Sequence, residues 1–246
     1  MLSPERQNQI RQNLQQVEDR IEKACQRAGR PRDSVTLVIV TKYHDPEDAL
    51  FLAQEGYRDF GENRVQELTA KMDFIDEQKE QVRWHMIGTL QRNKVKYISG
   101  RCQMIHSVNT LRLAQEISKR ALANETKESI LLQVNVTGED SKHGFTAEEV
   151  RKNLDAISNL EGLRLKGLMT MAEADADETR LRETFGGLRE LRDRCKDLLP
   201  DEKALLFNDL SMGMTHDFEI AIEEGADYIR LGTAILGPPA FSVHGQ

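Results

Sequence analysis

Short apolar segments rich in β-branched residues alternate with longer amphipathic segments along nearly the whole sequence. Such apolar runs are typical of parallel strands buried on both faces, and the periodic segments between them are typical of helices. We expect strands at 35–43, 57–60, 82–88, 103–106, 129–136, 163–169, 205–210 and 228–231, with helices between them. Eight strands alternating with helices over 246 residues predict an α/β fold, a single (β/α)8 TIM barrel with right-handed crossovers.

An open, doubly wound parallel sheet is the alternative architecture for this pattern. It is less favoured because no Gly-x-Gly-x-x-Gly motif follows the first strand. No linker rich in glycine, serine or proline interrupts the pattern, so residues 1–246 are predicted to form one domain. Residues 2–28 form an extra amphipathic helix, capped by Ser3 and ended by Gly29. We expect this N-terminal helix to cover the outside or the bottom of the barrel.

The charge and the apolar content exclude several classes of partner. A net charge of −7 argues against general binding to nucleic acid or to anionic membranes, which requires clustered lysine and arginine. The first residues are polar, and no apolar run reaches membrane-spanning length, so a cytoplasmic protein is expected. Three scattered cysteines and six histidines without paired ligand spacing predict neither disulfides nor a metal site.

The first predicted strand ends in a lysine, Lys42. In TIM barrels the functional site is built at the carboxyl ends of the strands, so the Lys42 side chain should enter the mouth of the barrel. Partial desolvation there would lower its pKa and make it a candidate for a Schiff base with a carbonyl compound. The alternative is an ordinary lysine in solvent at the end of a strand.

The last two predicted strands are followed by loops suited to a phosphate group. Ser211 and Gly213 follow the seventh strand, and Arg230, Gly232 and Thr233 lie at the end of the eighth. Barrels commonly hold phosphate in these two loops, through backbone amides, hydroxyl groups and a helix N-terminus. Together with a reactive Lys42, they indicate either a Schiff-base sugar-phosphate aldolase or a site for pyridoxal 5′-phosphate (PLP), and spacing does not separate the two.

Seven segments of the chain resemble the pyridoxal phosphate homeostasis protein family, in that family's order. The block at 84–94, Trp-His-Met-Ile-Gly-Thr-Leu-Gln-Arg-Asn-Lys, is the most specific of them. The others are 40–42, 60–67, 141–144, 167–171, 210–214 and 229–233. The family is similar to the N-terminal barrel of alanine racemase, without the second, β-rich domain of that enzyme. The resemblance implies the same barrel here.

The resemblance also implies roles for individual residues. Lys42 would carry PLP as a Schiff base, Asn63 would lie beside the cofactor ring, and Arg230 would face the pyridine nitrogen. The residues implied to hold the phosphate are Ser211, Gly232 and Thr233. An arginine stays protonated, so the ring nitrogen that it faces would stay unprotonated and the ring would be a poor electron sink. The contribution of His85 and Trp84, to packing or to the cofactor, stays open, as does that of Lys142 and His143 on a loop.

The function implied is PLP homeostasis: the protein would buffer PLP and deliver it to apo-enzymes, without robust catalysis and without catalytic residues of its own. Small amines or amino acids would release PLP by transimination, and a monomer is expected. The alternative is a PLP-dependent amino-acid racemase in which Lys42 is one base and Tyr43, His85 or Lys142 the other. A cofactor-free aldolase is the third reading.

Overall fold

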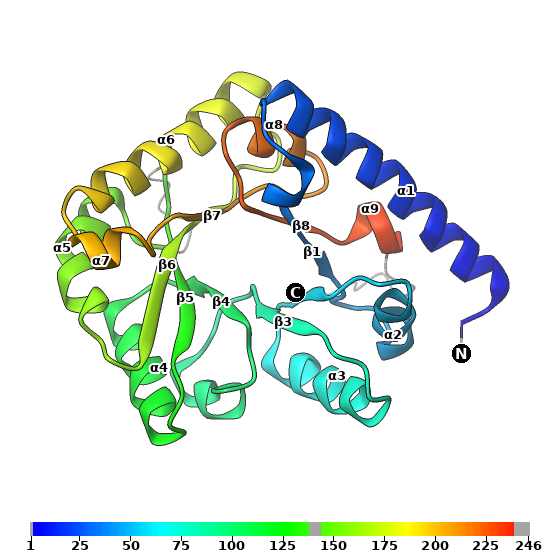
Figure 1. Ribbon diagram of the computed structural model, residues 1–246, viewed down its shortest axis with the longest axis horizontal. Coiled ribbons are helices and arrows are strands. Elements are labelled where there is room, and N and C mark those ends of the chain that lie inside the picture. Colours follow the sequence, from blue (N-terminus) through cyan, green and yellow to red (C-terminus); the bar gives the residue numbers. More distant parts are fainter. Residues whose placement is uncertain (1, 138–143, 239–246) are drawn as a thin grey trace.

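Eight parallel strands, paired in sequence order from β1 to β8, close into a barrel in the computed structural model (Figure 1). The structure describes residues 2–137 and 144–238. The strands are β1 (Thr36–Val40), β2 (Asp59–Glu62), β3 (Arg83–Met86), β4 (Met104–Val108), β5 (Glu128–Gln133), β6 (Leu163–Met169), β7 (Asp209–Ser211) and β8 (Tyr228–Leu231). The predicted (β/α)8 barrel is confirmed.

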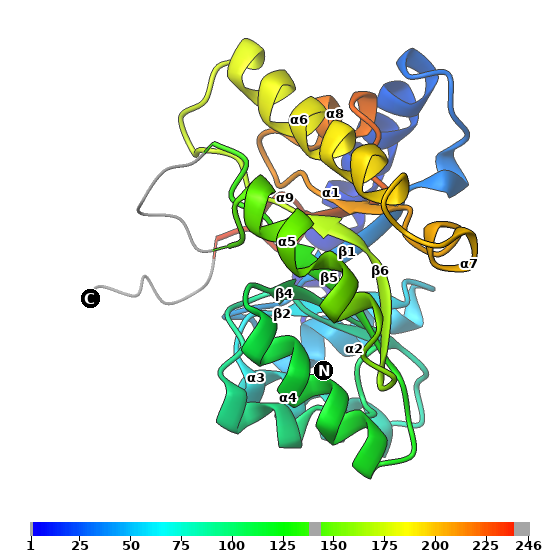
Figure 2. The ribbon, with the colours of Figure 1, turned by 90° about the vertical axis from the view of Figure 1, so that its left-hand side faces the viewer.

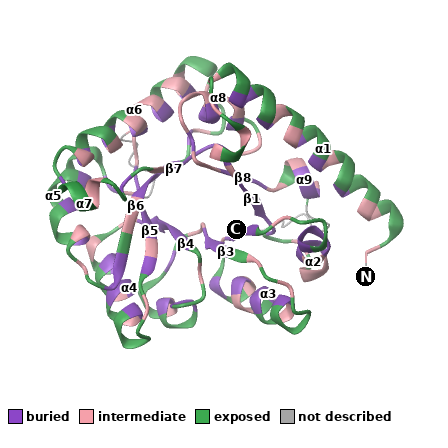
Figure 3. Ribbon diagram, viewed as in Figure 1, coloured by how far each residue is buried: buried purple, intermediate pink, exposed green. Residues whose placement is uncertain are grey.

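Helices form the outer layer around these strands. They are α1 (Pro4–Arg27), η1 (Arg32–Ser34), α2 (Pro46–Gln54), α3 (Val65–Glu77), η2 (Arg92–Tyr97), α4 (Leu111–Ala123), α5 (Ala147–Ser158), α6 (Glu178–Lys196), α7 (Asp201–Ala204), α8 (Phe218–Glu223) and α9 (Thr233–Leu236). In two views at right angles, α3 and α4 lie on the opposite side of the barrel from α6 and α8 (Figures 1 and 2). The strands and the inner faces of the helices are buried, whereas the outer faces are exposed (Figure 3).

Closure of the barrel brings distant parts of the sequence together. Strand β1 pairs with β8 in a register that sets Val38 beside Arg230 and Ile39 beside Leu231. Side chains that follow β1 therefore lie next to those that follow β8. This pairing places the Lys42 segment beside the turn at Gly232, which sequence order alone keeps far apart.

Helix α1 lies on the outside of the barrel, one of the two places expected for it. Its apolar stripe, Ile10, Leu14, Val17 and Ile21, is buried, and the helix packs against α8 and α9. Polar side chains on α1 also hold the end of α9, where Arg6 Nη1 donates to the carbonyl of Leu236 at 2.9 Å and Asn13 Nδ2 donates to Ile235 at 2.8 Å. The first helix of the chain thus supports the last.

The seventh strand begins later than the sequence pattern indicated. Residues 205–210 were expected to be extended, but β7 starts at Asp209, and the short helix α7 begins directly after Pro200. Leu205 and Leu206 lie in the turn after α7 and are 76% and 49% exposed. The apolar run at these positions suggested a strand. The prediction was wrong because hydrophobicity alone does not show which leucines face solvent. Of residues 92–98, expected to be helical, Arg92–Tyr97 form the 3-10 helix η2.

No helix within residues 2–137 and 144–238 is long and apolar enough to cross a membrane.

Asp209, the first residue of β7, lies partly buried at the amino end of the barrel. Burial raises the pKa of Asp209 from 3.8 to about 6, with Lys166 opposing the shift and Asp227 adding to it. The folded state therefore holds this proton more tightly than the unfolded chain does. The contribution of Asp209 to stability is most favourable below pH 3.8 and is lost as the pH rises through about 6.

We predict that Asp209→Asn raises the free energy of unfolding at pH 7 by about 1 kcal/mol, because it removes a buried charge. At pH 4 the gain should be much smaller, since the carboxyl is then largely protonated in the folded state and about half protonated in the unfolded chain. Urea unfolding at pH 4 and pH 7 measures the difference, with the exposed Asp19→Asn as control. A variant that is less stable than the parent at pH 7 would contradict this account of Asp209.

Candidate functional site

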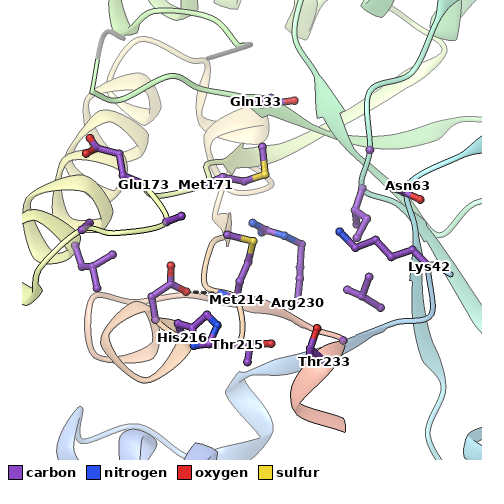
Figure 4. Close-up of a pocket in the computed structure, with 18 of the residues that line it drawn as sticks. Lys42, Asn63, Gln133, Met171, Glu173, Met214, Thr215, His216, Arg230 and Thr233 are labelled. Carbon is purple, nitrogen blue, oxygen red and sulfur yellow. Dashed lines mark hydrogen bonds between the residues drawn. The ribbon is translucent and has the colours of Figure 1, made fainter. Parts of the chain in front are cut away.

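A cavity of about 430 Å³ opens at the carboxyl ends of the strands (Figure 4). It is lined by residues in the last part of β1, β5 and β8 and by residues that follow β1, β2, β3, β6, β7 and β8. The predicted site residues that line it are Lys42, Asn63, Arg230, Gly232 and Thr233. The fold therefore gathers on one cavity residues that the sequence places almost 200 positions apart.

Lys42 extends into the cavity toward Arg230 (Figure 4). It follows the last residue of β1 by two positions, and its neighbour Tyr43 has a positive φ of 66°. The side chain of Lys42 is exposed, so the partial desolvation expected at the end of the strand is not found. An exposed amine inside an open cavity is accessible to a carbonyl compound.

A buried ion pair holds the backbone just before Lys42. Thr41 Oγ1 donates to Glu62 Oε1 at 2.7 Å, and Lys71 Nζ donates both to this carboxylate and to the carbonyl of Thr41. All three side chains are buried. Because Lys71 belongs to α3, this contact joins the ends of β1 and β2 to that helix. No pattern in the sequence indicates this ion pair, since a lone glutamate and a lone lysine usually lie on the surface.

Asn63 presents an unsatisfied amide at the end of β2. Within the described part of the chain its Oδ1 is buried and has no hydrogen-bond partner. The backbone of Asn63 is packed closely against Gly88, where a Cβ atom would lie 2.2 Å from the Asn63 carbonyl oxygen. Only glycine fits at position 88, and this contact keeps Asn63 at the cavity wall.

Arg230 is a buried cation at the base of the cavity, 5% exposed. Its Nη1 donates to Ser211 Oγ at 2.6 Å and its Nη2 donates to the carbonyl of Thr170 at 3.0 Å. Burial lowers the pKa of Arg230 to about 10, and the charge of Asp217 opposes that shift. Arg230 therefore stays protonated at neutral pH and can only donate hydrogen bonds.

Ser211 lies below the cavity, fully buried, and not on its wall. Its hydroxyl is already engaged, since it accepts from Arg230 and lies 2.7 Å from His106 Nδ1. Thr215, four residues later, does line the cavity beside Gly232 and Thr233. Sequence reasoning missed Thr215. The sequence feature that could have indicated Thr215 is its hydroxyl in the loop after β7. Closure of the barrel brings this loop opposite the turn after β8.

His85 and Trp84, whose roles were open, do not line the cavity. Trp84 packs against Phe60 with ring centroids 5.6 Å apart, and His85 is buried against Asp59 and His106. Lys142 and His143 lie outside the described residues. In the ranges that the structure describes, no group of three or more His, Cys, Asp or Glu side chains is arranged to hold a metal ion.

Comparison with known proteins identifies the family. The family described as "Alanine racemase, N-terminal domain" matches residues 12–239. The pyridoxal phosphate homeostasis protein of Aquifex aeolicus is 40% identical over 226 residues, which cover 92% of this chain and 96% of the relative. This chain belongs to the pyridoxal phosphate homeostasis protein family. The family member from Pseudomonas aeruginosa is 38% identical, over 93% of this chain and 95% of the relative.

Solved structures agree with this membership of the pyridoxal phosphate homeostasis family. PipY of Synechococcus elongatus with PLP bound has a TM-score of 0.79 and 30% identity, over 90% of this chain and 100% of that one. An unknown protein from Bifidobacterium adolescentis has a TM-score of 0.89 and 36% identity, over 96% and 97%. Alanine racemase of Clostridium difficile 630, at 16% identity and a TM-score of 0.72, shares the fold across 96% of this chain and 58% of its own length.

The buried ion pair next to Lys42 predicts a stability effect. We expect Lys71→Met to lower the free energy of unfolding by about 3 kcal/mol, because it leaves the buried Glu62 carboxylate without its cation. Adding Glu62→Gln should recover part of the loss. Urea unfolding measures both, and Lys23→Met on the exposed face of α1 is the control. If Lys71→Met costs no more than Lys23→Met, the pair does not support the fold.

Proposed function

We propose that this chain binds PLP in the cavity at the carboxyl end of the barrel and carries it covalently on Nζ of Lys42. In this role it serves intracellular PLP homeostasis, buffering the reactive aldehyde and delivering it to apo-enzymes. The observation that carries the proposal is the convergence of one exposed amine, one buried guanidinium and one glycine-hydroxyl turn on a single cavity. The PLP-bound structure of a relative that is 30% identical supports it.

The polar groups around the cavity fit the chemistry of PLP. Lys42 supplies an amine for the aldehyde, and the unsatisfied amide of Asn63 gains a partner from a group bound beside it. Gly232 and Thr233, with Thr215 opposite them, are proposed to hold the phosphate. At Gly232 a Cβ atom would lie 2.9 Å from the carbonyl of Val40, so a larger residue would push the two strands apart. We propose that Ser211 acts on the site through Arg230.

Arg230 limits the chemistry that the site can perform. PLP supplies an electron sink for carbanions at the α-carbon of an amino acid, and the strength of the sink depends on the protonation of the ring nitrogen. Arg230 keeps its own proton at neutral pH, so it would donate a hydrogen bond to that nitrogen and transfer no proton. We therefore propose that the chain has no robust catalytic turnover.

The positions of two candidate second bases also argue against a racemase. His85 is buried inside the barrel and Tyr43 is exposed, and neither lines the cavity. We further propose that residues 1–246 act as one domain, as a monomer in the cytoplasm. Release of PLP would follow attack by a small amine or amino acid, which takes the place of Lys42. The exposure of Lys42 supports this route.

The covalent anchor is tested by absorption and reduction. We expect purified protein mixed with PLP to absorb in the visible region, and borohydride to fix the cofactor to the peptide that contains Lys42. Lys42→Ala should lack this band, whereas Lys96→Ala, which removes an exposed lysine elsewhere, should keep it. A Lys42→Ala protein with an unchanged spectrum would remove Lys42 from the proposal.

The absence of turnover is tested in heavy water. Protein loaded with PLP should exchange the α-hydrogen of L-alanine slowly and should not produce D-alanine, because neither His85 nor Tyr43 lines the cavity as a second base. Proton NMR measures the exchange and chiral chromatography measures racemisation. Sustained formation of D-alanine would favour the racemase alternative.

A further inference from the structure

A continuous chain of hydrogen bonds runs through the inside of the barrel from its amino end to the cavity. Asp59 Oδ1 lies 3.0 Å from His85 Nε2, and His85 Nδ1 lies 2.9 Å from His106 Nε2. His106 Nδ1 lies 2.7 Å from Ser211 Oγ, which accepts from Arg230 at 2.6 Å. Asp59 begins β2 and Arg230 lines the cavity, so this hydrogen-bond chain connects the two opposite ends of the barrel.

These groups are shielded from water along most of the chain. His85, His106 and Ser211 are fully buried. The ring of Tyr228 packs against both histidines, with centroids 6.0 and 5.5 Å away. His106 and Ser211 belong to β4 and β7, which are not neighbours in the barrel, so their hydrogen bond crosses its interior. In such surroundings each hydrogen bond is strong, and each one left unmade is costly.

With both histidines neutral, the donors and acceptors satisfy one another in one direction. Arg230 has no acceptor, so it must donate to Ser211 Oγ, and the Ser211 hydroxyl is then best used to donate to His106 Nδ1. His106 is neutral, because burial lowers its pKa well below 6.5 and the charge of the buried Arg230 adds to that shift. Its single proton is therefore on Nε2 and is donated to His85 Nδ1. The proton of His85 is then on Nε2 and is donated to the carboxylate of Asp59.

The Asp59 end of the hydrogen-bond chain also carries an ion pair at the surface. Arg83, about half exposed, holds both carboxylate oxygens of Asp59. Hydrogen bonds to Arg83 and His85 lower the pKa of Asp59 against the effect of burial, which keeps the carboxylate charged. An anion thus ends the hydrogen-bond chain on one side and a buried cation on the other, and between them two neutral histidines have the polarity given above.

We propose that Asp59 is a positioning residue for the cofactor site, which holds the guanidinium of Arg230 in place through His85, His106 and Ser211. The identity of the ligand group that Arg230 would contact rests on the proposed function. The hydrogen-bond chain itself does not. A substitution at the far end of the barrel should therefore change the environment of a ligand that Asp59 never touches.

The direction of the chain is tested first, on wild-type protein without cofactor. Nitrogen-15 NMR of the side chains distinguishes the two neutral tautomers of histidine from the cation. We expect both His85 and His106 to be neutral and protonated on Nε2 at pH 7. A ring that is protonated on Nδ1, or on both nitrogens, would overturn the proposal, and this measurement requires no variant to fold.

The consequence for the site is tested with Asp59→Asn in the complete chain. We expect it to shift the absorption maximum of bound PLP and to weaken PLP binding on the order of fivefold, because the last histidine loses its charged acceptor. Arg83→Gln is the matched control, since it removes the same ion pair but leaves the bond between Asp59 and His85 in place. It should bind PLP within about twofold of the parent and with an unchanged spectrum.

The outcomes separate this proposal from the proposed function. An Asp59→Asn protein with the spectrum and affinity of the parent would overturn the positioning role, as would equal effects of Asp59→Asn and Arg83→Gln. A parent protein that binds no PLP would instead overturn the proposed function, and the histidine tautomers would still report on the chain.

Discussion

The pairing of the first strand with the last is the constraint on which the site depends. Hydrogen bonds between β1 and β8 close the barrel and set the register in which Ile39 lies beside Leu231. The residues that follow these strands, Lys42 on one side and Gly232 with Thr233 on the other, then share one wall of the cavity. A slip of one residue would turn Arg230 from the inside of the barrel to its outside, since neighbouring side chains on a strand face opposite ways.

The interior of this barrel contains many polar side chains, whereas the layer between the strands and the helices is mainly apolar. The main apolar cluster involves the strands and the surrounding helices, whereas a second, small cluster comprises Met104, Leu131 and Met169 with Tyr228 packed against it. Much of the remaining interior is polar, and its groups bond to one another. TIM barrels usually fill this space with branched apolar residues. Here the outer layer supplies most of the apolar burial, and part of the interior is left to support the cavity.

The sequence predicted the residues whose place follows from the ends of strands. Lys42, Arg230 and Gly232 could be assigned to the mouth of the barrel because each comes at the end of a recognisable strand. Their polar partners could not. Nothing in the sequence tells that Lys71 turns inward to Glu62, or that Ser211 bonds to His106, because such pairs arise only when separate strands and helices come together. The error at Leu205 has the same origin: apolar character does not say which side of a turn faces water.

The support that α1 gives to α9 has a consequence for the order in which the site is assembled during synthesis. Arg6 and Asn13 are translated early, but the carbonyls that they bind, at Leu236 and Ile235, leave the ribosome more than 200 residues later. Contacts between such distant residues form late in folding, because a long loop must be closed first. A nascent chain therefore exposes Lys42 long before the turn at Gly232 and Thr233 exists. Tight retention of a phosphorylated ligand through the proposed role of this turn would consequently be a property of the released protein, not of the growing one.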